Sequence, residues 1–382
     1  MQIDLLHQGF DGLDIAFKVR LRPALAMQLE RAREQAAVQR SPQLVNVEGY
    51  PMHVLESGAR GGYRYTCDTG PMGATWFFKV PSQNDPWGVR VSAKSLPLAL
   101  NGIRAVEAEF LAFVAALCGN LPPDGVSLGR VDYCLDFLFP DFDLNPEQFV
   151  MHSRLTRTTD REASEVGRSG RTASMRIGKM PGQQVAVYDK RSDVMAKSKA
   201  AWWEIWNAKR KALGLPPISA DTTQGSLWRV EFRAGKNFLK KQKGITTLEK
   251  FLRVGGSLFS EMAESIRYVS PAADSNRARW PSHSLWLAVQ SHLAAGLHEM
   301  TDALPASRVR EIASAELIDI LDKQILGCEA TLIAALDLAD VELSDLARFA
   351  ADRIKKQIES DPDRFRHKMT KATERYFFLG VS

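Results

Sequence analysis

One tyrosine in this chain of 382 residues stands at the end of an apolar stretch, directly before a cluster of charged residues. The segment QQVAVYDK alternates Val185 and Val187 with other residues and ends on Tyr188, Asp189 and Lys190. A tyrosine phenol can be a structural hydrogen-bonding group, or it can act as a nucleophile. Because a nearby ammonium group favours the phenolate, Tyr188 beside Lys190 is a candidate nucleophile.

Carboxylates and arginines alternate with apolar residues along two further expected strands, GRVDYCLDF and SLWRVEFR. Successive side chains of a strand point to opposite faces, so the polar residues of each strand share one face. This face carries Arg130, Asp132, Asp136, Arg229, Glu231 and Arg233. Arginine–carboxylate pairs on a solvated sheet face can be purely structural. Three acids and a tyrosine on one basic sheet nevertheless favour a functional site.

The chemistry that suits these residue types is phosphodiester transfer. Three carboxylates without histidine are hard oxygen ligands, which Mg²⁺ or Mn²⁺ prefers, and such an ion would bind a scissile phosphate. Since the reference pKa of tyrosine is about 10, the metal and Lys190 would have to favour the phenolate during attack. We therefore predict metal ligands Asp132, Asp136 and Glu231, with Tyr188 and Lys190 as catalytic residues.

Basic residues are concentrated in one part of the chain. The net charge is +5, yet residues 154–243 contain 20 Lys and Arg against 8 Asp and Glu. A concentrated positive region is typical of a protein that binds a polyanion, although a solvated surface would have the same composition. The side chains that we expect to contact DNA are those of Arg130, Arg176, Lys179, Arg191, Arg229 and Arg233.

Other kinds of site are not indicated by the sequence. The seven histidines form no HxH or HExxH motif, the four cysteines form no CxxC pair, and no P-loop motif is present. No stretch approaches the roughly 20 apolar residues of a membrane span, and the first residues lack the basic region of a signal peptide. We therefore expect a cytoplasmic protein without a membrane partner.

The elements that would position these residues follow one order twice. The order strand, helix, several strands, helix is expected over 1–122, and 123–270 repeats it, with a helix near NPEQFVMHSRLT. We predict an α+β fold of two similar units of antiparallel sheet with helices on one face, a saddle-like duplicated core. The second unit carries the catalytic face, and 275–382 forms an α-helical C-terminal domain.

A long segment separates the tyrosine strand from the SLWRVEFR strand, and it includes the expected helix KSKAAWWEIWNAKRKALGLPP. Its tryptophans are Trp202, Trp203 and Trp206. Tryptophans in such a helix pack more often than they stack on bases. The sequence leaves open whether the segment contacts DNA, contacts a second subunit or has no functional role.

Taken together, these segments resemble the replication initiation factor family, the Rep_trans type of rolling-circle Rep proteins and relaxases of plasmids, filamentous phages and integrative elements. The resemblance rests on GFDGLDIAF, GRVDYCLDF, SMRIGKMPGQQVAVYDKRSD and SLWRVEFR, in that order, and covers about residues 8–265. It implies that Tyr188 of the Y-[DN]-K motif nicks one DNA strand and stays joined to its 5′ phosphate. Asp132 and Asp136 match the acids of R-x-D-x-x-x-D, and Glu231 matches the glutamate of W-R-x-E. The long tryptophan-rich segment departs from the commonest pattern of the family.

We therefore predict a metal-dependent, site-specific DNA endonuclease and strand transferase that initiates rolling-circle replication. The alternatives are a conjugative relaxase with the same chemistry, a non-catalytic origin-binding or regulatory DNA-binding protein, and an RNA-binding protein with Trp202 and Trp206 as stacking platforms. Expected partners are origin DNA, including the single strand at the nick, a host helicase bound through the C-terminal domain, and a second copy of the chain. A dimer could supply the second cleavage that termination requires.

Overall fold

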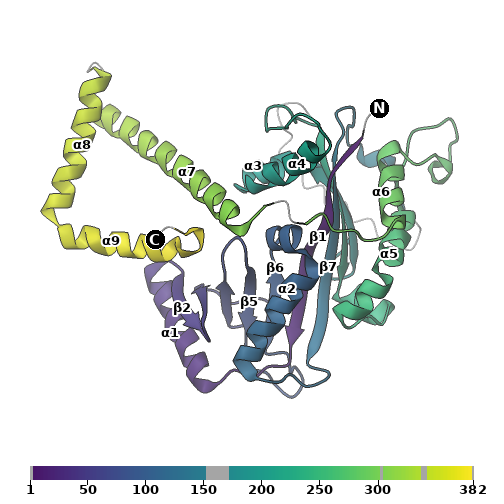
Figure 1. The fold of residues 1–382 in the computed structure, drawn as a ribbon, viewed down its shortest axis with the longest axis horizontal. Coiled ribbons are helices and arrows are strands. Elements are labelled where there is room, and N and C mark those ends of the chain that lie inside the picture. The colour runs from purple at the N-terminus through teal and green to yellow at the C-terminus, as the bar shows by residue number, and fades with distance from the viewer. Residues whose placement is uncertain (1–2, 152–171, 302–303, 337–341, 381–382) are drawn as a thin grey trace.

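The computed structural model describes residues 3–151, 172–301, 304–336 and 342–380 (Figure 1). It is a mixed α/β fold built on one large antiparallel sheet with the strand order β2-β3-β4-β5-β6-β1-β7-β11-β10-β9. The strands of this sheet are β1 (Asp4–Phe17), β2 (Gln43–Val47), β3 (Tyr50–Val54), β4 (Tyr65–Asp68), β5 (Ala74–Phe78), β6 (Val89–Ala93), β7 (Val126–Leu138), β9 (Ser174–Gly178), β10 (Gln183–Asp189) and β11 (Leu227–Gly235).

The centre of the sheet is the pair of long strands β1 and β7. Strand β1 pairs with β6 on its other side, and β7 pairs with β11 on its other side. One half of the sheet consists of β1 to β6 and the other of β7, β9, β10 and β11. In each half, the strand that comes first in the chain, β1 or β7, therefore lies at the centre of the sheet and pairs with the last strand of that half, β6 or β11. The two predicted sheets are joined into one continuous sheet, and the duplication within it stays a prediction.

One face of the sheet is apolar and is covered by four helices. These helices are α1 (Pro23–Gln39), α2 (Ser95–Cys118), α5 (Leu248–Ser265) and α6 (Ser284–Ala294). Their apolar residues recur at helical spacing, as Leu25, Leu29, Ala32 and Ala36 do in α1, and pack with the inward side chains of the strands into one core. Helix α6 lies within the predicted C-terminal domain but belongs to this core.

The opposite face is not left to solvent. Helices α3 (Lys190–Ala196) and α4 (Ala201–Ala212) lie near the centre of the sheet, where α4 contacts β1 and α3 contacts β11 (Figure 1). There Trp202, Ile205 and Trp206 of α4 are buried in a second, smaller apolar cluster. The prediction of helices on only one face is therefore wrong for this part of the sheet, because the apolar side of α4 needs a surface to cover.

Local predictions failed at two further places. The expected helix near NPEQFVMHSRLT is a single 3₁₀ turn, η1 (Pro146–Gln148), followed by β8 (Phe149–Met151), which pairs with β12 (Ile266–Tyr268). Phe149 is buried against Tyr268 in the core, which favours the strand, and the rest of this expected helix lies outside the described residues. The hairpin of β2 and β3 was not predicted.

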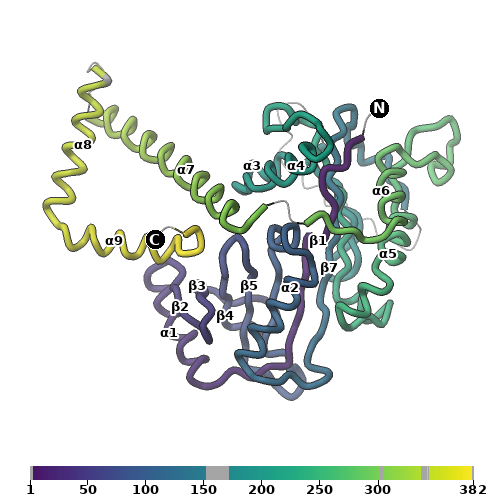
Figure 2. The backbone as a smooth tube through the Cα atoms, in the orientation of Figure 1, coloured from purple at the N-terminus to yellow at the C-terminus, as the bar shows by residue number. Residues whose placement is uncertain are grey.

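The C-terminal part is helical, as predicted. Figure 2 shows α7 (Ala306–Ala335), α8 (Leu343–Ser360) and α9 (Pro362–Arg375) running outward and back to β2. Helix α7 is joined to α4 by an ion pair of 2.6 Å between Arg308 and Glu204, and His53 Nε2 lies 2.8 Å from the carbonyl of Glu374 in α9. Shorter turns are η2 (Asn237–Gln242), η3 (Arg277–Arg279) and η4 (Phe377–Leu379). Among the described helices, none is both long enough and apolar enough to cross a membrane.

Candidate active site

The polar residues of the three key strands lie on one face of the sheet, as the alternation along each strand predicts. In the strand pairing, Arg229 stands between Asp136 and Tyr188, and Arg233 stands between Asp132 and Gln184. Glu231 lies between these two rows on the same strand. The sheet therefore brings the candidate nucleophile and the candidate acids to one surface.

Tyr188 is hydrogen-bonded to one of those acids. Its Oη donates to Oε2 of Glu231 at 3.2 Å. Arg233 donates to both oxygens of Glu231, from Nε and from Nη2, each at 2.7 Å. Nη1 of Arg233 donates in turn to the side chain of Gln184 at 2.8 Å. The carboxylate that faces the phenol is thus held in a fixed orientation by a bidentate pair.

The electrostatics of the site keep the Tyr188 phenol protonated. Burial raises the pKa of Tyr188 well above its ordinary value, and the charge of Glu231 raises it further. Lys190 begins α3, is buried, and donates from Nζ to Asp193 at 2.8 Å, with its ammonium 5.8 Å from the centre of the Tyr188 ring. The expected activation of the phenol by Lys190 does not fit this arrangement, because Lys190 forms an ion pair with Asp193. Glu231 is the carboxylate within hydrogen-bond distance of the phenol.

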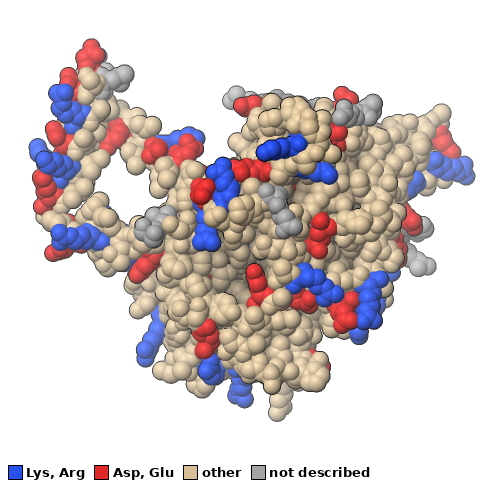
Figure 3. Space-filling view, viewed as in Figure 1, with Lys and Arg blue, Asp and Glu red and all other residues tan. Residues whose placement is uncertain are grey.

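A polar pocket of about 270 Å³ opens beside this pair. Six of the predicted site residues line it, namely Tyr188, Lys190, Asp132, Glu231, Arg130 and Arg233. Its lining also includes Asp11, Asp14, Asp193, Lys197 and Lys199, which gives five basic and five acidic side chains in all. Figure 3 likewise shows basic and acidic residues interspersed over the face in view. The pocket is polar and charge-balanced rather than uniformly basic.

Asp132 forms the floor of the pocket beneath Gly12. Nε and Nη2 of Arg130 hold its two oxygens at 2.9 and 2.6 Å. Burial raises the pKa of Asp132 to about 7. The charge of Arg130 lowers this pKa, and the charge of Glu231 raises it. A Cβ atom on Gly12 would lie 2.5 Å from Oδ2 of Asp132, so only glycine lets β1 approach this carboxylate so closely.

Asp136 and Arg229 lie below the surface and outside the pocket. Both side chains are 0% exposed, and Arg229 holds the two oxygens of Asp136 from Nε and Nη2 at 2.5 and 2.7 Å. Trp206 donates from Nε1 to Asp136 at 2.9 Å, and Arg229 also pairs with Asp11. The predicted metal-ligand role of Asp136 and the predicted DNA contact of Arg229 do not fit this geometry. Neither side chain lines the pocket in this arrangement.

The predicted metal-ligand set of three carboxylates is therefore not assembled. Asp132 and Glu231 line the pocket but are each held by an arginine, and Asp136 is buried beneath it. Across the part of the chain that the structure describes, no three His, Cys, Asp or Glu side chains are grouped so that they could hold a metal ion. Mg²⁺ or Mn²⁺ stays a prediction from the sequence, and no chemical step is derived through it.

The tryptophan-rich segment covers the buried ion pair. The indole of Trp202 lies over the Arg229 guanidinium, 4.4 Å from ring centre to Cζ, and over Nζ of Lys190 at 5.0 Å. Trp202 and Trp206 are 1% and 0% exposed. Because both rings are buried, neither can stack on a base. The segment packs instead against the buried pair of Arg229 and Asp136.

The other predicted DNA contacts are spread around the site. Lys179 is exposed in the turn between β9 and β10, and Arg176 is half-buried on β9. Arg191 donates from Nε to the carbonyl of Ala220 at 2.6 Å. These three side chains do not line the polar pocket.

Asp11 and Lys199 are among the pocket residues that were not predicted. Asp11 lies where β1 changes register against β7, between Phe10 and Gly12, and the glycine on each side in GFDG was the available signal of an irregular strand. Burial would raise the Asp11 pKa, but Arg229 and Lys190 outweigh it and lower the pKa. Lys199 precedes α4, and its pKa is lowered by burial and by Lys190. No sequence pattern distinguished Lys199 from its neighbours.

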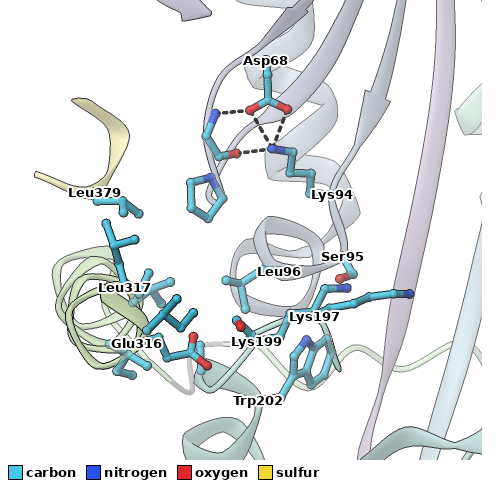
Figure 4. Close-up of a pocket in the computed structure, with 18 residues that line it drawn as sticks. Asp68, Lys94, Ser95, Leu96, Lys197, Lys199, Trp202, Glu316, Leu317 and Leu379 are labelled. Atoms are coloured by element: carbon cyan, nitrogen blue, oxygen red, sulfur yellow. Dashed lines mark hydrogen bonds and ion pairs between the residues drawn. The ribbon is translucent and has the colours of Figure 1, made fainter. Parts of the chain in front are cut away.

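A second, mainly apolar pocket of about 570 Å³ lies next to the polar one (Figure 4). Lys197 and Lys199 line both pockets, while α7 contributes Glu316 and Leu317 to the apolar one. Ala200 donates its backbone N–H to Glu316 at 3.0 Å, so α7 is attached to the loop that carries these lysines. The C-terminal helices thus reach the edge of the candidate site.

Comparisons with known proteins leave the family open. No family model matches the chain, and no curated protein matches it. A solved structure described as a rolling circle replication initiator protein from Geobacillus stearothermophilus is similar over 79% of this chain and 100% of that one, with 13% sequence identity and a TM-score of 0.38. Similarity at this level does not decide the function, which must be argued from the site itself.

Proposed function

We propose that this chain is a rolling-circle replication initiator that nicks and rejoins one DNA strand, with Tyr188 as the nucleophile. The observation that carries the proposal is the hydrogen bond from Tyr188 Oη to Glu231 in a polar pocket. A nucleophile with its proton acceptor in hydrogen-bond reach, and the acceptor oriented by a third group, is the arrangement that covalent catalysis needs. The motif resemblance described above supports the same assignment.

In the proposed step, Oη of Tyr188 attacks the scissile phosphorus and its proton passes to Glu231. The new bond joins Oη to phosphorus, and the bond to the 3′ oxygen of the adjoining nucleotide breaks. That 3′ oxygen takes up a proton from water and leaves as a hydroxyl, and Glu231 returns its proton to water, so the step has no net gain or loss of protons. The phosphotyrosine bond conserves the phosphodiester energy, and attack by a 3′ hydroxyl reverses the step and rejoins DNA.

Cations beside the phenol would stabilise the charge on the phosphate as it reacts. Arg233 and Arg130 line the pocket, although each is paired with a carboxylate. Lys199 lines it as well and forms no ion pair with a carboxylate among the described residues. Lys199 is therefore the side chain best placed to receive a phosphate oxygen.

The test uses supercoiled DNA that carries the origin of the genetic element encoding the chain, with Mn²⁺ in the buffer. The proposal predicts an open-circular product with protein covalently attached, and neither product with Tyr188→Phe. Tyr50→Phe is a matched control, because Tyr50 is exposed on β3 and does not line the polar pocket or the pocket that continues it. Open circles without attached protein would indicate attack by water and contradict the proposal.

A further inference from the structure

A third pocket, of about 600 Å³, continues the polar pocket along the same face of the sheet. Asp14 and Arg130 line both pockets. In the strand pairing, Arg130 lies beside Asp14 on one side and Gly235 on the other, six residues along β7 from the row that contains Asp136, Arg229 and Tyr188. At about 3.3 Å per residue, the rows are about 20 Å apart. That distance corresponds to a few nucleotides of an extended strand.

Basic side chains predominate in this third pocket, unlike in the polar one. Its lining holds six basic residues and two acidic ones, which are Arg60, Lys79, Arg90, Arg130, Lys236 and Lys240 against Asp14 and Asp85. Lys79 pairs with Asp85, and Arg130 pairs with Asp132. Among the described residues, the other four basic side chains form no ion pair with a carboxylate. Arg90 lies over the rings of Tyr63 and Phe77, so the charges available to an anion are those of Arg60, Lys236 and Lys240.

Trp87 lines the same pocket and is half-buried. It lies in the loop between β5 and β6. Nζ of Lys18, which also pairs with Asp124, lies over its ring at 5.4 Å from the centre, and Nζ of Lys240 lies over it at 5.7 Å. An aromatic ring together with lysines is the combination with which proteins bind single-stranded nucleic acid, since the ring stacks on a base while the lysines bind phosphates.

The walls of the pocket are tied together before any ligand binds. Lys79, which follows β5, donates from Nζ to the carbonyl of Gly61 at 2.8 Å, and its Nζ lies 4.5 Å from the ring centre of Tyr63. These contacts join the loop after β5 to the loop before β4. Tyr63 donates from its hydroxyl to the carbonyl of Trp87 at 3.3 Å. Lys240 donates to Ser127, and its pKa is lowered by burial and by Lys236. Lys236 and Lys240 both line the pocket and form no ion pair among the described residues, which fits a bound phosphate.

We propose that this third pocket binds the DNA single strand next to the scissile phosphate, with a base stacked on Trp87 and phosphates held by Lys236, Lys240 and Arg60. The inference rests on the proposed function for the identity of the strand, and it adds a binding subsite and a path along the sheet from Tyr188. The apolar pocket beside α7 also has lysines and a tryptophan in its lining, but that tryptophan, Trp202, is 1% exposed and its ring contacts Arg229, so a base cannot stack on it.

The test is fluorescence anisotropy of a labelled oligo-dT of about 16 nucleotides, which is long enough to cover both pockets, with the full chain. Trp87→Ala should weaken binding about ten- to a hundredfold, the usual effect of removing one base-stacking ring, and Trp87→Phe should restore most of it. Lys236→Gln should lower the slope of log affinity against log salt by about 0.7. Lys250→Gln is the matched control, since Lys250 is exposed on α5, over the opposite face.

Unchanged affinity in Trp87→Ala, or equal losses in Trp87→Ala and Trp87→Phe, would overturn the proposal. A loss of affinity in Lys236→Gln without a loss in Trp87→Ala would mean that the pocket binds only an anion, which contradicts the proposal. Tighter binding of oligo-U than of oligo-dT would assign the pocket to RNA and would contradict the proposal as well. Binding is measured without cleavage, in the Tyr188→Phe background as well as in the wild type. A chain that binds through Trp87 but never nicks DNA would contradict the proposed function and leave this inference standing.

Discussion

The Tyr188 phenol donates a hydrogen bond of 3.2 Å to Glu231, and Arg233 holds both oxygens of that carboxylate. Burial and Glu231 together raise the pKa of the phenol, so the resting state is a protonated nucleophile beside its base. This differs from the activation by Lys190 that the sequence suggested. The requirement for a base leads to the first prediction.

Glu231→Gln should slow nicking by about 10²- to 10⁴-fold, because it removes the proton acceptor and keeps the shape of the side chain. DNA affinity should stay close to that of the wild type. Below the raised pKa of the phenol, each pH unit increases the phenolate fraction about tenfold. The residual rate of Glu231→Gln should therefore climb with pH through the alkaline range. A variant rate equal to the wild type would rule out Glu231 as the base.

Gly12→Ala should impair nicking more than it impairs folding. The added methyl group would meet Asp132, whose carboxylate is clamped by Arg130 under the pocket, so this pair must shift. Gly9→Ala, on the same strand, is the matched control, because its Cβ would make only an ordinary contact of 3.4 Å with His7. Initial nicking rates and urea unfolding of both variants check this, and equal nicking rates would contradict it.

Arg229→Gln should destabilise the protein by about 3 to 5 kcal/mol, because it leaves Asp136 buried without its charged partner. The double variant Arg229→Met with Asp136→Leu should recover part of that loss, since it removes the buried pair but leaves Asp11 without Arg229. Urea unfolding of the three proteins provides the measurement. Wild-type stability of Arg229→Gln would mean that Asp136 is not buried as an ion.

His7 should make the stability of the fold depend on pH. Its side chain is 1% exposed, and neither ring nitrogen has a hydrogen-bond partner among the described residues. Burial lowers its pKa to about 4, while the nearby charge of Asp136 raises the pKa and that of Arg229 lowers it. An unfolded chain binds this proton near pH 6.5 and the folded one only near 4. His7 therefore does not lower the free energy of unfolding above pH 6.5. As the pH falls from 6.5 towards 4, the free energy of unfolding falls by about 3 kcal/mol because of this residue.

The unfolding free energy of His7→Gln, compared with that of the wild type at pH 7 and at pH 4.5, isolates this contribution from other titrating groups. The difference between the two proteins should shift in favour of the variant at the lower pH. A difference that does not change with pH would show that His7 is protonated as readily in the folded protein as in the unfolded one.

Strand alternation predicted which residues would share a face, because side-chain direction in a strand depends only on local geometry. It could not show which of them stay accessible. Arg229 and Asp136 follow the same pattern as Arg233 and Asp132, but α4 folds back over the first pair and leaves the second at the pocket. Burial of that kind is decided by a tertiary contact with a segment about 25 residues away in sequence from Arg229.

Asp11 and Trp87 were missed for a related reason. The position of Asp11 depends on a shift in register between β1 and β7, and Trp87 reaches the sheet face from a loop. Irregular strands and loops have no periodicity from which the direction of a side chain could be predicted. The apolar cores of the helices and strands were predictable because they are periodic, whereas these functional candidates are not.

The central claim, that Tyr188 is the nucleophile, is tested most directly by mapping the covalent product. The chain is incubated with a labelled single-stranded oligonucleotide spanning the origin nick site, digested with protease and nuclease, and analysed by mass spectrometry. We expect a nucleotide attached through its 5′ phosphate to the peptide that contains Tyr188, and no adduct in Tyr188→Phe. An adduct on any other residue, or cleavage without an adduct, would contradict the central claim.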